Sequence, residues 1–491
     1  MVRKFIDLID NHKVAALLVA SLFFSFLTVT FASQIASFVY PRFSLDAYYN
    51  DASIFTIMGK SFVDGKTPYV EVYDHKGLYI FYYTAIMGVF GKPGLFILQF
   101  ALFSINFFLL GLTAKEMGAR KSAVIWIMLL FTAGYCGFGQ SPADAEMEMP
   151  FMAGMMYCYA RGCMRKEDKS YFIGNLLAGF TAGIALNLRI TDSVIALSFV
   201  VYFGVTAIIQ RRWRFLLLNA LICLGGVFIA CIPPYAHAFA GGFMHEYLDA
   251  AYFANFRYVG KVSIYENRIL AFLLIFALWG TLFLLTILKR KAIGKEGVMF
   301  FAITGGVSFI VQLVIANYPH YLIVTFDYLA LSYGLLASKA LEKESLNLGR
   351  KIVTGVFILG TLACLSTNLI ISYQSYAVEE MTTSFIDSVL TEEDKDGHVL
   401  VVNAAPAYYL QLGITPGYPD FALQENHAPI SPYFNFDAFV SYLESPSCHY
   451  AIVRKNEEMF PEFLSKTDAV YELIEPSNGI TPLVKLYRHI A

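Results

Sequence analysis

The chain has 491 residues, of which 57% are hydrophobic and only 15% are charged. Soluble domains carry about 25% charged residues, so this composition excludes a soluble fold of this size. The formal net charge of −2 excludes a strongly basic field of the kind that binds nucleic acid. Residues 14–38 form an apolar run too long for the hydrophobic part of a signal peptide, and we expect a retained first membrane helix there.

Apolar runs along the rest of the chain predict a polytopic α-helical membrane protein. A spanning helix needs about 20 apolar residues. This length predicts about eleven transmembrane helices, at 14–38, 94–114, 122–140, 149–163, 171–188, 193–210, 215–235, 268–288, 298–316, 322–340 and 352–373. Residues 78–90 are apolar but too short to span, so we expect a helix that lies at the outer interface.

Basic residues concentrate in alternate loops between these spans. The loops rich in Lys and Arg are 115–121, 161–169, 211–214, 289–295 and 342–351. The short loops between them, at 141–148, 189–192 and 317–321, carry one basic residue, Arg189. Because positive loops stay in the cytoplasm, the N-terminus is predicted to be cytoplasmic. Residues 39–93 then form a long external loop, and everything after about residue 374 is extracytoplasmic.

The C-terminal part of the chain differs in composition from the rest. Residues 374–491 are rich in acidic residues, Pro and Gly, with short strand-like apolar runs at 398–403 and 449–453. This pattern predicts a small soluble α/β domain outside the membrane, after a transmembrane domain at 1–373. The seven cysteines show neither paired spacing nor the spacing of metal ligands, so we expect no disulfide framework.

Acidic residues cluster on the predicted outer face, although charges near a bilayer are costly and usually functional. Asp51 and Asp74 lie in the first external loop, and Asp144, Glu146 and Glu148 follow the third span within five residues. Three carboxylates so close together repel one another unless a cation, a basic side chain or a metal ion offsets them. We therefore interpret both loops as candidate functional segments.

Other candidate residues have simpler alternatives. Arg189 lies in an apolar context and needs an anionic partner, either Asp192 or a phosphate group of a ligand. His320 and Tyr321 lie at the outer ends of the ninth and tenth spans, where water could satisfy His320. Asp74 could simply be the N-cap of the interfacial helix.

The first external loop resembles that of a known superfamily. The matching segments are Asn50-Asp51-Ala52-Ser53-Ile54-Phe55, Gly59-Lys60, Asp64-Gly65-Lys66-Thr67-Pro68-Tyr69 and Tyr73-Asp74-His75-Lys76-Gly77. They are similar to the first loop of bacterial GT-C glycosyltransferases, which include protein O-mannosyltransferases and the lipid A aminoarabinose transferase. The loop 141–148 and the cluster Tyr318-Pro319-His320-Tyr321 extend the resemblance over most of the membrane domain. Leu78 departs from it, since the family commonly has proline there.

The resemblance implies a GT-C-like membrane enzyme of the plasma or inner membrane. Such an enzyme would transfer a sugar from a polyprenyl-phosphate donor to a glycan, lipid or protein acceptor outside the cytoplasm, such as a cell wall polysaccharide. The family's acidic loop residue maps to Asp51, and its second acidic position to Glu146, with Asp144 next. A carboxylate can deprotonate the acceptor hydroxyl as a general base, and a single displacement then inverts the anomeric carbon. We expect Asp51 to be this base and Glu146 to be an auxiliary base or a metal ligand.

The leaving phosphate develops negative charge, which a cation would stabilise. Lys76 and Arg189 are the expected phosphate ligands, and we include the other polar residues of these loops in the binding set: Asp74, His75, His320 and Tyr321. A divalent metal ion held by Asp51 and Glu146 is the alternative source of positive charge. The rival function is a transporter or flippase of lipid-linked sugars. Transporters usually show internal repeats and ionisable residues near mid-membrane, which this sequence does not show.

Overall fold

The computed structural model of the chain describes residues 14–33, 51–119, 121–138, 144–259, 266–315, 319–340, 379–402, 404–422, 430–433, 436–454, 470–476 and 484–490. Helices lie over each of the first ten predicted spans. The eleventh span, 352–373, the loop 342–351 and the domain boundary at 373 lie outside the described residues. The number of eleven spans and the boundary therefore stay predictions.

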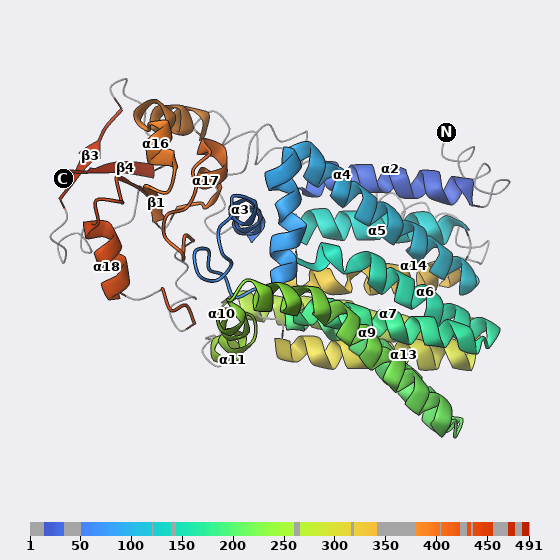
Figure 1. The fold of residues 1–491 in the computed structure, drawn as a ribbon. Coiled ribbons are helices and arrows are strands. Elements are labelled where there is room, and N and C mark those ends of the chain that lie inside the picture. The colour runs from blue at the N-terminus through green and yellow to red at the C-terminus, as the bar shows by residue number, and fades with distance from the viewer. Residues whose placement is uncertain are drawn as a thin grey trace.

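The membrane part is a bundle in which most helices lie side by side (Figure 1). Its helices are α2 (Ala15–Ala32), α4 (Leu78–Glu116), α5 (Lys121–Phe138), α6 (Met149–Arg165), α7 (Asp168–Leu186), α8 (Val194–Ile209), α9 (Trp213–Ala240), α12 (Glu266–Leu288), α13 (Arg290–Ile315) and α14 (Phe326–Ala340). Five described segments are long and apolar enough to cross a bilayer: Ala15–Ala32, Leu78–Glu116, Ile190–Ile209, Trp213–Ala240 and Ile293–Val314. The prediction of several membrane helices is confirmed.

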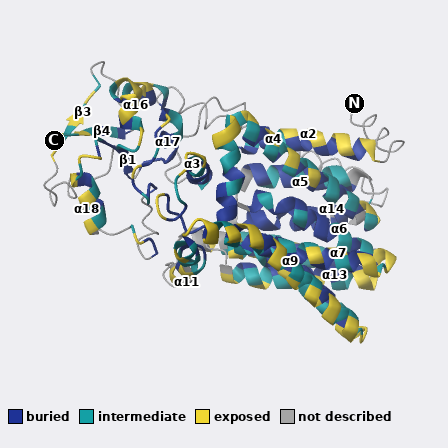
Figure 2. Cartoon of the chain, viewed as in Figure 1, coloured by how far each residue is buried: buried dark blue, intermediate teal, exposed yellow. Residues whose placement is uncertain are grey.

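Helix α9 shows most clearly that the surface of the bundle suits lipid. Large apolar side chains along it are exposed, including Leu217 at 65%, Phe228 at 71% and Phe239 at 79% (Figure 2). In water, a continuous apolar surface of this kind would drive association or aggregation. In a bilayer the same side chains contact acyl chains at no cost, so we assign this surface to the hydrocarbon.

Helix α4 bends sharply where the sequence changes from an interfacial to a spanning pattern. Gly91 has φ 64° and ψ −164°, outside the helical region, and Pro93 follows two residues later. Glycine adopts a positive φ without steric cost, so it accommodates this kink. The part before Gly91 runs across the end of the bundle, and the part after it joins the bundle (Figure 1). A helix over 78–90 and a second helix over the predicted span 94–114 are therefore both present, joined at Gly91. The interfacial position of the first helix stays a prediction.

Several short elements gather at this same end of the bundle (Figure 1). Helix α3 (Asp51–Val63) packs on α4. The sequence predicted only a long external loop over 39–93 and did not predict α3. A Cβ atom on Gly59 would lie 2.3 Å from the backbone of Thr84, so only glycine permits this close crossing. The other short elements are η1 (Asp144–Met147), η2 (Ile190–Ser193), α10 (Met244–Leu248), η3 (Asp249–Phe253), α11 (Ala254–Val259) and η4 (Pro319–Thr325).

The opposite end of the bundle carries basic residues of the predicted cytoplasmic loops. Arg165 forms an ion pair with Glu116 at 2.6 Å, joining the ends of α6 and α4. Arg212 pairs with Asp168 at 2.5 Å, joining the starts of α9 and α7. These basic loops therefore lie on one face, as the charge pattern requires. Which face is cytoplasmic stays a prediction.

The C-terminal part contains a small mixed sheet of order β1-β2-β4-β3. Strand β1 (Val399–Val402) is parallel to β2 (Tyr450–Arg454), while β4 (Val484–His489) is antiparallel to both β2 and β3 (Tyr471–Ile474). The helices here are 379–389, α16 (Glu392–Lys395), α17 (Ala407–Leu412) and α18 (Phe436–Glu444). The two strand-like runs of the sequence correspond to β1 and β2, which are buried and rich in β-branched residues.

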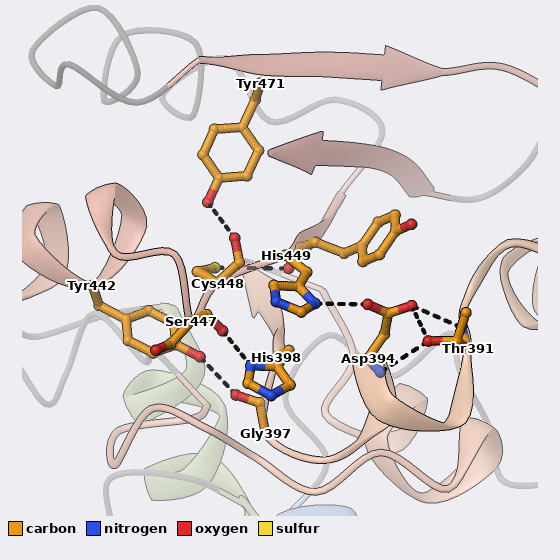
Figure 3. Close-up of polar contacts among 10 residues, drawn as sticks. Thr391, Asp394, Gly397, His398, Tyr442, Ser447, Cys448, His449 and Tyr471 are labelled. Atoms are coloured by element: carbon orange, nitrogen blue, oxygen red, sulfur yellow. Dashed lines mark hydrogen bonds and ion pairs between the residues drawn. The ribbon is translucent and has the colours of Figure 1, made fainter. Parts of the chain in front are cut away.

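A polar cluster joins the start of α16 to β2 (Figure 3). Thr391 and Asp394 form a reciprocal capping box, and Asp394 Oδ1 lies 2.7 Å from His449 Nδ1. Burial raises the pKa of Asp394, but hydrogen bonds from Thr391 and His449 outweigh it and hold the pKa below its usual value. The His398 and His449 rings stack with centroids 4.3 Å apart. These contacts are all internal to the C-terminal segment.

Candidate functional site

Asp51 begins helix α3 at the end of the bundle that carries the interfacial part of α4. Within the described part of the chain, no side chain forms a hydrogen bond or ion pair with its half-buried carboxylate. One turn later, the carbonyl of Phe55 accepts a hydrogen bond from Thr84 Oγ1 of α4 at 2.6 Å. The α3 backbone close to Asp51 is therefore anchored to α4, and the oxygens of the Asp51 carboxylate remain available to another group.

The segment after α3 is a tight turn with an unusual backbone. Tyr69 has φ 65°, a left-handed conformation that is uncommon for residues other than glycine. Its N–H donates to the Val72 carbonyl at 2.8 Å. The Glu71 carboxylate accepts from the Thr67 N–H at 2.8 Å, and this bond, together with Lys66, lowers the pKa of Glu71. Glu71 therefore closes the turn.

Asp74, His75 and Lys76 follow as a buried, mutually contacting set. The exposed fractions of these residues are 1%, 6% and 8%. The Lys76 ammonium lies 3.5 Å from Asp74 Oδ1 and 3.2 Å from His75 Nε2, and it lies over the Phe55 ring of α3 at 5.5 Å. The Lys76 N–H also donates to Asp74 Oδ1 at 2.9 Å. A buried cation is thus held beside α3. The alternative role of Asp74 as a helix N-cap is wrong, because the N-cap of α4 is Gly77.

The loop that contains Arg189 runs directly beside this set. The Gly77 N–H donates to the Leu188 carbonyl at 3.0 Å, and the Tyr79 N–H donates to the Asn187 carbonyl at 3.2 Å. Arg189 Nε donates to the buried Asp192 carboxylate at 2.8 Å. Lys76 directly precedes Gly77, and Arg189 directly follows Leu188. Gly77 and Leu188 belong to two backbone segments that are joined by a hydrogen bond. The structure therefore places the backbones of the two expected phosphate ligands side by side.

Gly77 is required for this junction, which leads to a first prediction. A Cβ atom there would lie 2.1 Å from the Asn187 carbonyl oxygen. Gly77→Ala should force the two segments apart and cost about 1–3 kcal/mol of stability. We expect a lower melting temperature of the purified protein in detergent. Gly204→Ala is the control, since its Cβ would meet nothing within 4 Å. Equal melting temperatures for the two variants would contradict the close approach.

Glu146 lies in η1 and is 1% exposed. Tyr83 donates to one carboxylate oxygen and Tyr135 to the other. Gln99 Nε2 also donates to the first oxygen at 2.9 Å. The carboxylate thus ties the acidic loop to both parts of α4 and to α5. Asp51 and Glu146 reach the same end of the bundle through contacts with α4.

These bonds make Glu146 a structural anchor as well as a candidate catalytic group, and a second prediction follows. Hydrogen bonds to a charged group contribute about 1.5–3 kcal/mol each. Glu146→Gln, which removes the charge, should lower the melting temperature. Tyr135→Phe should also lower it, by a smaller amount. Combined, the two changes should be less than additive because they break the same bond. Additive effects measured in a double-variant thermal series would contradict the anchor.

Three expected site residues are described only by their backbone. Asp144 lies in η1, and His320 and Tyr321 lie in η4, but their side chains are outside the described residues. Among the described side chains, no group of three His, Cys, Asp or Glu residues could hold a metal ion. The roles of these residues, and the metal site proposed for Asp51 and Glu146, stay predictions.

The polar residues that hold the site together were not predicted from the sequence. Gln99 lies inside a predicted span and binds Glu146. Asn106, another polar residue of α4, donates to the buried Asp327 of α14 at 2.7 Å. Polar residues inside apolar runs are costly, and this signal could have identified both. The tyrosines gave no such signal, because tyrosine is common at membrane interfaces.

The bundle of apolar helices, with α3 and the first part of α4 at one end, resembles a solved structure. The fold is shared with the crystal structure of ArnT from Cupriavidus metallidurans, a GT-C lipid A aminoarabinose transferase, bound to undecaprenyl phosphate. The two chains superpose with a TM-score of 0.55 and 12% sequence identity, over 97% of this chain and 98% of ArnT. The fold that the resemblance implied is therefore confirmed. No protein-family model and no curated protein sequence matches the chain.

Proposed function

We propose that the chain is a membrane glycosyltransferase that transfers a sugar from a polyprenyl-phosphate donor to an extracytoplasmic acceptor. The observation that carries this proposal is the pairing of the Asp74-His75-Lys76 segment with the Leu188-Arg189 segment, which puts two cations at one end of an apolar bundle. The shared fold with a protein crystallised with undecaprenyl phosphate supports it. A glycan of the cell envelope is the acceptor that we favour.

The donor phosphate would lie at the junction of these two segments. Lys76 already has Asp74 as a counter-ion at 3.5 Å, so a phosphate would join an existing charge network. Arg189 carries a planar guanidinium, a group suited to binding two phosphate oxygens at once. The prenyl chain would lie along the exposed apolar surface of the bundle. As the glycosidic C–O bond breaks, these cations stabilise the charge that develops on the phosphate.

The acceptor hydroxyl would be activated by Asp51. No described side chain is bonded to its carboxylate, so the carboxylate can accept a proton from an incoming hydroxyl. The acceptor oxygen then bonds to the anomeric carbon as the polyprenyl phosphate leaves with the electron pair of the old bond. One displacement inverts the configuration at that carbon. Glu146, held by Tyr83 and Tyr135, would shape the electrostatic field nearby.

The test is a product assay on the purified chain with a panel of polyprenyl-phosphate sugars. We expect release of free polyprenyl phosphate with at least one donor, with the sugar passed to an acceptor or to water. In sealed vesicles, donor added to one side should be consumed without appearing on the other side. Translocation of intact donor without cleavage would instead indicate a flippase. The proposal would be contradicted if no donor of the panel were bound or cleaved.

A further inference from the structure

We propose that Tyr69 and Tyr433 are positioning residues, through which the C-terminal segment clamps the turn that presents Lys76 to the donor phosphate. The inference rests on the proposed function for the identity of the ligand, but the clamp itself is a set of hydrogen bonds that can be measured separately. It gives the C-terminal segment a role in donor binding.

Tyr69 links the strained turn to the cation. Its hydroxyl donates to the carbonyl of Lys76 at 2.9 Å, and its residue is only 1% exposed. The ring packs against those of Phe81, Phe243 and Tyr247, with centroids 5.5, 6.3 and 5.7 Å away. A left-handed backbone at a residue with a large side chain costs about 1–3 kcal/mol and persists only where the surroundings enforce it. The surroundings here hold the hydroxyl against Lys76.

Tyr433 holds the same turn from the C-terminal side. Its hydroxyl lies 3.2 Å from the carbonyl oxygen of Tyr69 and 2.9 Å from that of Val70, and donates to both. Its ring meets the Tyr73 ring edge to face, with centroids 5.8 Å apart. Tyr433 is thus joined to Tyr69, which contacts Lys76, although the two tyrosines are more than 350 positions apart in the sequence.

Tyr73 gives the clamp a second attachment, three residues before Lys76. Its N–H donates to the Pro419 carbonyl at 2.8 Å, and its hydroxyl donates to the Ile430 carbonyl at 3.0 Å. Asn255 of α11 completes the enclosure by donating to the His75 carbonyl at 3.0 Å. The backbone from Tyr69 to Lys76 is therefore fixed by polar contacts from two other parts of the chain.

The chemistry of this contact distinguishes positioning from simple packing. Carbonyl groups of the turn accept bonds from tyrosine hydroxyls, and such bonds fix the orientation of a peptide unit, whereas apolar packing tolerates sliding. A flexible lysine gains affinity for a ligand when its backbone and surroundings are preorganised, because less conformational freedom is lost on binding. Loosening the turn should therefore weaken donor binding before it affects the chemical step.

The experiment compares Tyr433→Phe and Tyr69→Phe with a matched control, Tyr471→Phe. The Tyr471 hydroxyl also donates to two carbonyls, of Leu443 and Cys448, at 3.1 and 3.2 Å, but these lie inside the C-terminal segment. Two readouts are used on each variant: hydrogen–deuterium exchange of the amides from 67 to 77, and the dissociation constant for undecaprenyl phosphate. We expect Tyr433→Phe and Tyr69→Phe to speed exchange in the turn and weaken binding about 3- to 10-fold. Tyr471→Phe should change neither.

The outcomes separate the clamp from the function. Unchanged exchange in the turn of both test variants would overturn the clamp. Faster exchange with unchanged affinity would overturn the positioning role, because the turn would then be held for another purpose. An equal loss of affinity in Tyr471→Phe would overturn it too, since a general destabilisation would explain the result. Absence of undecaprenyl phosphate binding by the parent chain would overturn the proposed function, and the exchange data would still report whether the clamp exists.

Discussion

Asp51→Asn should reduce sugar transfer by about 10²- to 10⁴-fold, which is the usual contribution of a general base. Asparagine keeps the size and polarity of the side chain but cannot accept a proton at neutral pH. Asp51 lies at the start of α3 with no described side chain bonded to it, so the change should leave the fold intact. Binding of undecaprenyl phosphate should also persist. The measurement is the initial rate of donor cleavage with saturating acceptor.

Asp64→Asn is the matched control for this change. Asp64 follows α3 and forms an exposed ion pair with Lys60 at 2.7 Å, so its loss removes a carboxylate from the same loop. Surface pairs of this kind contribute little, about 0–1 kcal/mol. The control should therefore keep the parent rate. Full activity in Asp51→Asn, or an equal loss in the control, would remove Asp51 from the mechanism.

Lys76→Met should weaken the binding of undecaprenyl phosphate by about 10- to 100-fold, because a charge-assisted hydrogen bond contributes about 1.5–3 kcal/mol. Methionine preserves much of the buried apolar stem and removes only the ammonium. The change also leaves the Asp74 carboxylate, 1% exposed, without its cation. The double variant Asp74→Asn/Lys76→Met removes both charges and separates loss of binding from loss of folding.

The control for Lys76 is Lys60→Met, which removes a cation from α3 at the surface. It should bind undecaprenyl phosphate as the parent does. We expect weak binding in both Lys76 variants, with the melting temperature recovered in the double variant. Parent-like affinity in the correctly folded double variant would show that Lys76 does not bind the phosphate.

The bundle could be predicted from the sequence because each span is a local run of apolar residues. An apolar run of sufficient length must be helical in lipid, where no water can satisfy backbone groups. The change from the interfacial to the spanning part of α4 was equally local: a short apolar run, then Gly91 and Pro93. Helix α3 was missed because Asp51, Lys60 and the following turn residues suggested a polar loop. The packing of its apolar face on α4 outweighs that local signal.

The site could be predicted only in part. The segment Asp74-His75-Lys76 was identified through its resemblance to a known loop, and Arg189 through its isolation in an apolar context. Their proximity depends on the bond between Gly77 and Leu188, which joins residues more than 100 positions apart. No periodic pattern encodes such a contact. The attachment of Tyr433 to Tyr69 spans a still longer separation and gave no signal in the sequence.

Glu146 has contacts in the structure that its predicted role did not include. Three carboxylates in a short loop indicated a site that needs positive charge, and Glu146 was expected to bind a metal ion or act as a base. In the structure, tyrosine hydroxyls and a glutamine amide satisfy its oxygens. Hydrogen-bond donors can offset a buried carboxylate as a cation would. Sequence alone could not identify these donors, because they come from α4 and α5.

The most direct test of the account is a structure of the chain in complex with undecaprenyl phosphate. We predict that the phosphate lies at the end of the bundle where Gly77 meets Leu188, within hydrogen-bonding distance, about 3 Å, of the Lys76 ammonium. Arg189 should contact it or lie one water molecule away. A phosphate bound at the opposite end, beside the ion pair of Arg212 and Asp168, would contradict the account.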